Sequence, residues 1–117
     1  MANLLTINAM TETFVKKAHK IMRAKGYKMT PLKESAMVQW IYEKEGATSV
    51  TICGWHGTGR YGKLKLVWEL MEVYKYSTQT VYAFDTRFVD SFNSMNETHW
   101  KLYLETLEKM EKYLGGL

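Results

Sequence analysis

The chain has 117 residues, of which 46% are hydrophobic and 24% charged, and its net charge is +4. This length allows one domain with its own core, and the composition excludes a disordered or collagen-like chain. No apolar run approaches the roughly 18 residues of a membrane span, and the first residues do not resemble a signal peptide. We therefore expect a single soluble domain over residues 1–117, located in the cytoplasm.

The cysteine content and the charge distribution limit which kinds of site and partner the protein can have. Cys53 is the single cysteine, which excludes an internal disulfide, and no Cys/His spacing is typical of zinc, so no metal is expected. Residues 1–33 hold seven basic side chains against one acid, Glu12, whereas the remainder is slightly acidic. Such a basic segment suits an acidic partner, although lysines on a helix are more often ordinary solvated surface.

The first half of the chain predicts a strand, a helix and a β-hairpin. Residues 4–7 (LLTI) favour a short strand, and Thr11 stands where an N-cap would precede an amphipathic helix that ends at Gly26. Pro31 marks a link. Residues 36–42 and 48–55, joined by the turn at 43–46, then predict two antiparallel strands.

The second half predicts a helix, a strand and a longer helix. Leu64, Val67, Leu70, Met71 and Tyr74 recur at helical spacing. Residues 80–84 favour a strand, and Ser94 with Glu97 resembles a capping box that opens a helix ending at glycines 115 and 116. The expected fold class is α+β, with a central, mostly antiparallel sheet of about four strands flanked by three helices.

Four glycines, Gly54, Gly57, Gly59 and Gly62, lie from the end of the second hairpin strand to the helix expected over 64–74. A strand that passes through such a turn into a helix leaves backbone N–H groups free to bind an anion. Arg60, Lys63 and Lys65 lie at this expected helix start, where cations oppose the helix dipole unless an anion is bound between them. The alternative is a glycine turn with no ligand.

The expected order of elements is a hairpin, a glycine-rich turn, a helix, a strand, and then Asn96 followed by Tyr103 on a helix. This order resembles the core of the GNAT family of N-acetyltransferases, in a minimal or degenerate form. The resemblance implies a GNAT-like fold and acetyl-CoA as cofactor. It assigns Tyr103 as general acid toward the departing thiolate, with Glu43 or His56 as candidate bases. The residues that it assigns to cofactor binding are Gly57, Gly59, Arg60, Tyr61, Gly62, Lys63 and Asn96.

Two other functions compete with this N-acyltransferase hypothesis. The first is a non-catalytic binding module or inhibitor, of a kind found in viruses, that contacts nucleic acid or an acidic protein through its N-terminal helix. Trp40, Tyr42 and Trp55 are candidates for a stacking platform beside that helix. The second is an oligomeric structural protein with an exposed apolar face on its last helix. The basic residues assigned to the binding module are Lys16, Lys17, Lys20, Arg23 and Lys25.

Overall fold

Among the residues that the structure describes, five consecutive strands form one antiparallel sheet in which the spatial order follows the chain order, so that each strand pairs with the next. The computed structural model describes residues 4–34, 37–58, 62–86 and 96–117. A helix precedes the sheet and another follows it. The elements are α1 (Leu4–Ala24), β1 (Lys28–Glu34), β2 (Met37–Glu43), β3 (Ser49–Thr58), β4 (Leu64–Val73), β5 (Thr78–Asp85) and α2 (Glu97–Gly115).

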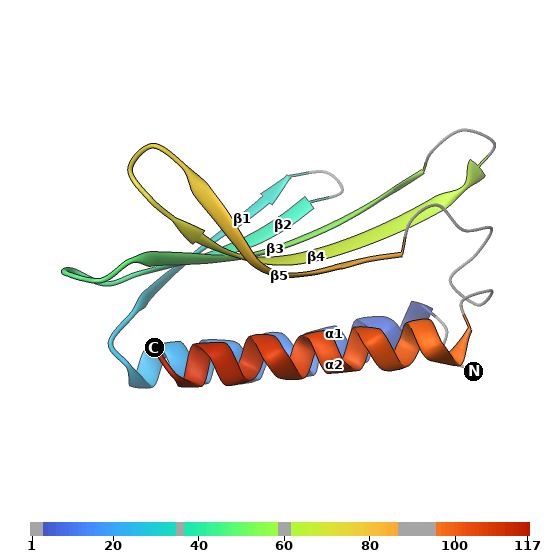
Figure 1. The fold of residues 1–117 in the computed structure, drawn as a ribbon, viewed down its shortest axis with the longest axis horizontal. Coiled ribbons are helices and arrows are strands. Elements are labelled where there is room, and N and C mark those ends of the chain that lie inside the picture. Colours follow the sequence, from blue (N-terminus) through green and yellow to red (C-terminus); the bar gives the residue numbers. More distant parts are fainter. Residues whose placement is uncertain (1–3, 35–36, 59–61, 87–95) are drawn as a thin grey trace.

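Both helices cover the same face of the sheet and lie side by side along the long axis of the molecule (Figure 1). They also run in the same direction. Thr11 of α1 shares a buried hydrogen bond with the hydroxyl of Tyr103 on α2. Farther along both helices, Lys25 Nζ donates to the main-chain oxygen of Leu117 at 2.7 Å. The two hydrogen bonds have the same sequence separation, as two parallel helices require.

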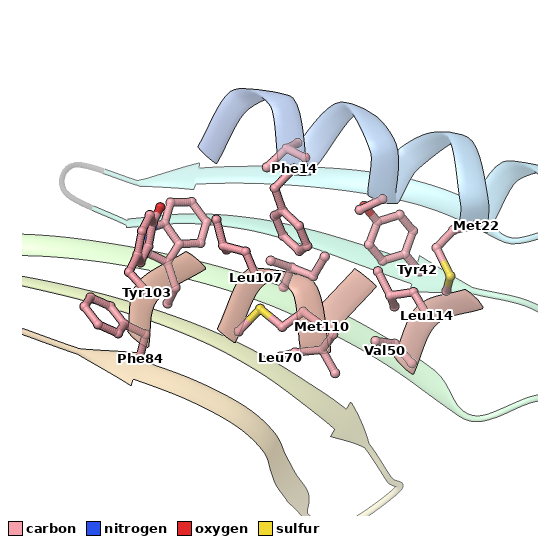
Figure 2. Close-up of a cluster of buried hydrophobic side chains, with 14 of the residues drawn as sticks. Phe14, Met22, Tyr42, Val50, Leu70, Phe84, Tyr103, Leu107, Met110 and Leu114 are labelled. Carbon is pink, nitrogen blue, oxygen red and sulfur yellow. The ribbon is translucent and has the colours of Figure 1, made fainter. Parts of the chain in front are cut away.

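The core fills the space between this helix pair and the covered face of the sheet (Figure 2). Alternate residues of each strand point toward the helices, because successive side chains of a strand face opposite sides. Both helices and every strand from β2 to β5 contribute to the core. Its buried hydrophobic members are Phe14, Val15, Ala18, Met22, Tyr42, Val50, Ile52, Leu66, Trp68, Leu70, Phe84, Trp100, Tyr103, Leu107, Met110 and Leu114.

The first helix is longer than expected at its N-terminal end. Residues 4–7, expected to form a strand, belong to α1, and Thr11 lies inside the helix rather than at its N-cap. The predicted C-terminal end is confirmed. Gly26 has a φ of +89°, and the amides of Gly26 and Tyr27 donate to the carbonyls of Arg23 and Met22, which is the Schellman arrangement.

The prediction of a helix over 64–74 is wrong. This segment forms β4, which is paired with β3 along the full length of β4. The segment carries two periodicities. Leu64, Val67, Leu70 and Met71 fit a helix, but Leu64, Leu66, Trp68 and Leu70 also alternate as in a strand. Consecutive cross-strand pairs with β3 decide between them, since tertiary pairing outweighs local propensity.

The remaining differences concern β1 and the start of α2. The link at Pro31 is part of β1, an edge strand of the kind that tolerates proline. The long last helix is confirmed, but Asn96 is its N-cap and accepts a 2.9 Å hydrogen bond from the amide of His99. The expected cap, Ser94, lies outside the described residues. The fold is thus α+β in one domain, with five strands and two helices across the described residues instead of four and three.

Candidate functional site

The glycine-rich turn does not lead into a helix. Gly57 is paired within β3, and Gly62, with a φ of +72°, precedes β4. Gly59, Arg60 and Tyr61 lie outside the described residues. Because Lys63 also leads into a strand, β4 replaces the helix start that was expected to bind an anion. Acetyl-CoA binding stays a prediction, without a helix dipole at this turn to support it.

The candidate catalytic residues lie far apart. Tyr103 is fully buried between the helices and the sheet, and burial raises its pKa to about 12, so this phenol has no access to a ligand. Glu43 ends β2 level with the start of β3. His56 is seven residues further along β3, about 23 Å away at the usual strand rise. The side-chain oxygen of Asn96 is already used to cap α2.

Three of the five predicted basic residues come together on α1. Lys16, Lys20 and Arg23 follow one another at spacings of four and three residues, so they lie along one exposed stripe of the helix. Lys16 contacts Glu12 at 3.5 Å, a solvent-exposed pair of little energetic weight. Within the described part of the chain, neither Lys20 nor Arg23 forms an ion pair.

The other two basic residues do not belong to this stripe. Lys17 is exposed on α1 and is not among the residues that line the three hollows described below. Lys25 is half-buried, and its ammonium group donates to Leu117 at the end of α2. Lys44 in turn donates to the carbonyl of Lys25 at 2.8 Å. These two lysines satisfy carbonyls at the helix C-termini, where a cation is favoured by the helix dipole.

Three adjoining hollows share His19 and run beside α1, and we call them together the His19 groove. The first, of about 400 Å³, lies between α1 and Trp40 of β2. The second, of about 230 Å³, lies between α1 and the start of the sheet at Tyr27, Lys28 and Tyr42. The third, of about 430 Å³, lies among the basic side chains of α1 itself. The residues of the groove are Thr11, Glu12, Val15, Lys16, His19, Lys20, Arg23, Ala24, Tyr27, Lys28, Met29, Trp40 and Tyr42.

His19 is fixed at the centre of this groove by aromatic neighbours. Its Nδ1 atom lies 2.5 Å from the hydroxyl of Tyr42, and its ring meets that of Trp40 edge-on at 5.8 Å. Burial, with a smaller contribution from the charge of Arg23, lowers the pKa of His19. The imidazole is therefore mostly neutral at neutral pH and adds an aromatic surface beneath the cations.

The expected stacking platform is only partly assembled. Trp40 is half-buried and lines the groove beside the basic stripe. Tyr42 is 1% exposed and supports the groove from below. Trp55 is 37% exposed, but it directly follows Gly54, which is on the side of the helices. Because successive side chains of a strand face opposite sides, Trp55 lies on the other face of the sheet.

Sequence reasoning missed His19 and Lys28. A usable signal was present for His19, which lies three residues after Lys16 and four before Arg23, and so on the same side of the helix. Lys28 carried no such signal, because only the turn at Gly26 brings β1 back alongside α1.

Other classes of site find no support in the described residues. No group of three or more His, Cys, Asp or Glu side chains among them is placed to hold a metal ion. Neither helix, over its described length, is long and apolar enough to cross a membrane. Most of the apolar face of α2, on which the oligomeric hypothesis relied, is buried against the sheet and α1, while Leu104 of that face is 41% exposed. No family model, curated protein or solved structure matches the chain.

Proposed function

We propose that the protein is a non-catalytic binding module that holds nucleic acid through the basic stripe of α1 and the His19 groove. The observation that carries this proposal is the alignment of Lys16, Lys20 and Arg23 along the rim of the groove. Lys28 adds a fourth cation from β1 on the other side of His19. Cations in such a row match the regular spacing of phosphates in a nucleic acid backbone.

Charge and ring chemistry together favour nucleic acid over an acidic protein. A protein carboxylate needs only the cations, whereas a nucleic acid also presents bases that pack on aromatic rings. The groove offers both, since His19, Trp40 and Tyr27 line its hollows beneath the lysines and Arg23. Residues 34–117 hold nine basic and eleven acidic side chains, so the remainder of the chain adds no net attraction for such a ligand.

The experiment compares two variants that lose the same number of charges from different helices. The first replaces Lys16, Lys20 and Arg23 by Gln. The control replaces three lysines of α2, Lys101, Lys109 and Lys112, by Gln. Binding of labelled single-stranded and duplex oligonucleotides is followed by fluorescence anisotropy over a range of salt concentrations.

We expect the wild-type affinity for at least one of these ligands to fall steeply with salt. The α1 variant should bind at least about tenfold more weakly at low salt. Its slope of log K against log salt should be smaller by about 2 to 3, since each phosphate that the protein no longer neutralises lowers the slope by about 1. The α2 control should bind almost as wild type. If both variants lose affinity equally, net charge and not the α1 stripe governs binding, and the proposal is wrong.

A further inference from the structure

The hollow between α1 and Trp40 differs chemically from the rim above it. Val15, His19 and Trp40 make its walls apolar and aromatic, whereas Lys16 stands at its edge. Binding inside this hollow would be unfavourable for a phosphate, because a charged group loses its hydration in apolar surroundings. At about 400 Å³, the hollow falls within the roughly 300 to 1,000 Å³ of small-ligand sites and has room for one planar base.

The rings that line this hollow are held in place before any ligand arrives. Trp40 is stacked on Trp68, with ring centroids 5.9 Å apart and planes 6° from parallel. Trp68 is itself only 7% exposed. On the other side, His19 is hydrogen-bonded to the buried hydroxyl of Tyr42. A ligand packing here would therefore immobilise few side chains, which lowers the entropic cost of binding.

Cations lie on both sides of the His19 ring. Lys16 borders the hollow at Trp40, while Arg23 and Lys28 border the neighbouring hollow beyond His19. A strand that placed one base against Trp40 and His19 would bring its flanking phosphates toward these two groups of cations. Glu12 also lines the first hollow and is paired with Lys16, and its negative charge disfavours a phosphate next to it.

We infer that the nucleic acid bound by this protein is single-stranded, with one unstacked base held in the His19 groove against Trp40 and His19 and the flanking phosphates at Lys16, Arg23 and Lys28. This inference rests on the proposed function. In a duplex the bases are already stacked and paired, and extruding one of them costs binding energy that a single strand does not spend.

Three ligands separate the contribution of the base from that of the phosphates. They are an oligothymidine of about 12 nucleotides, an abasic sugar–phosphate chain of the same length and charge, and a duplex of that length. A base stacked on an aromatic side chain changes affinity by about 5- to 150-fold. We therefore expect wild-type protein to bind oligothymidine at least about fivefold more tightly than the abasic chain or the duplex.

A pair of matched variants assigns the preference to the groove. Trp40→Leu should reduce the affinity for oligothymidine to that for the abasic chain and leave the latter unchanged. Trp55→Leu, which removes the exposed tryptophan of the opposite face, should change neither. Circular dichroism verifies the fold of each variant, and the wild-type comparison of the three ligands stands without any variant.

Each outcome decides between the two proposals. Equal wild-type affinities for the three ligands would overturn the base-binding inference but leave the nucleic-acid function standing. A preference for oligothymidine that Trp40→Leu does not alter would also overturn it, because the base must then bind elsewhere. Absence of binding to all three would remove the proposed function itself.

Discussion

Gly54 lies directly against the indole ring of Trp68, so closely that a Cβ atom at position 54 would come within 2.5 Å of that ring. The two residues are cross-strand partners on β3 and β4. Trp40 is on β2, two strand spacings or roughly 10 Å from β4. Because position 54 has no side chain, the indole of Trp68 is able to extend across β3 and stack on Trp40, which fixes one wall of the His19 groove.

Replacing Gly54 by alanine should therefore destabilise the protein. The added methyl group must displace a buried indole ring, and overpacking of this kind costs about 1 to 3 kcal/mol. Urea unfolding followed by tryptophan fluorescence measures the decrease in stability. Gly115→Ala is the control, since a Cβ atom there meets open space. If Gly54→Ala proves as stable as Gly115→Ala, the close approach of Trp68 has no energetic role.

The packing of α2 on the sheet gives a second prediction from two leucines of one helix. Leu107 is 6% exposed within the core, whereas Leu102 is 50% exposed. Leu107→Ala should lower the free energy of unfolding by about 2 to 5 kcal/mol, because it removes apolar burial and leaves a cavity. Leu102→Ala should change it by less than about 0.5 kcal/mol. Equal decreases in denaturant unfolding would contradict the placement of α2.

Much of the fold was predictable wherever the sequence carries one unambiguous period. The hairpin of β2 and β3, the C-terminal end of α1 at Gly26 and the long α2 follow from alternation, a glycine cap and helical spacing. The segment Leu64–Val73 was not predictable in this way, because it is apolar on both faces and satisfies two periods at once. Its state is set by long-range pairing with β3, which local reasoning cannot weigh.

The same contrast applies to the candidate site. Lys16, Lys20 and Arg23 share one stripe because helix geometry alone places them there. The contribution of Trp40 was anticipated only as part of a platform with Trp55, whose position in the strand puts it on the other face. Lys28 joins the site through tertiary contact between α1 and β1, which no local pattern specifies.

The carboxylate of Glu72 on β4 makes the folding stability of the protein decrease at low pH. It accepts hydrogen bonds from the hydroxyls of Tyr113 and Tyr74, and the bond from Tyr113 is the larger cause that lowers the pKa of Glu72. The unfolded chain therefore takes up this proton more readily than the folded protein does. The stabilising contribution is complete above the ordinary glutamate pKa of about 4.3 and is lost as the pH falls through the lower, folded value.

Glu72→Gln should accordingly flatten the fall in stability between about pH 7 and about pH 3.5. Urea midpoints at a series of pH values measure this for wild type and variant. Glu108→Gln, at an exposed position of α2, serves as the control and should retain the wild-type profile. Identical profiles for wild type and Glu72→Gln would show that the two tyrosines do not stabilise the charged carboxylate.

His19 should make binding in the groove stronger as the pH falls. In the free protein, burial and then Arg23 lower the pKa of His19, so the imidazole is mostly neutral at about pH 7.5. A phosphate close to the ring favours its protonated form, and by linkage protonation favours the phosphate. The other charged or titratable groups that face the groove are Glu12, Lys16, Lys20, Arg23, Tyr27, Lys28 and Tyr42.

Between about pH 7.5 and about pH 5.5, histidine is the side chain that normally titrates. Anisotropy titrations with oligothymidine should therefore show severalfold tighter binding at the lower pH for wild type, and a flat profile for His19→Gln. His99→Gln, which removes the exposed histidine of α2, should keep the wild-type increase. Folding stability should change in the opposite direction, because a lowered histidine pKa makes the unfolded chain the stronger proton acceptor below about pH 6.5. An increase in affinity that persists in His19→Gln would place the titrating group outside the groove.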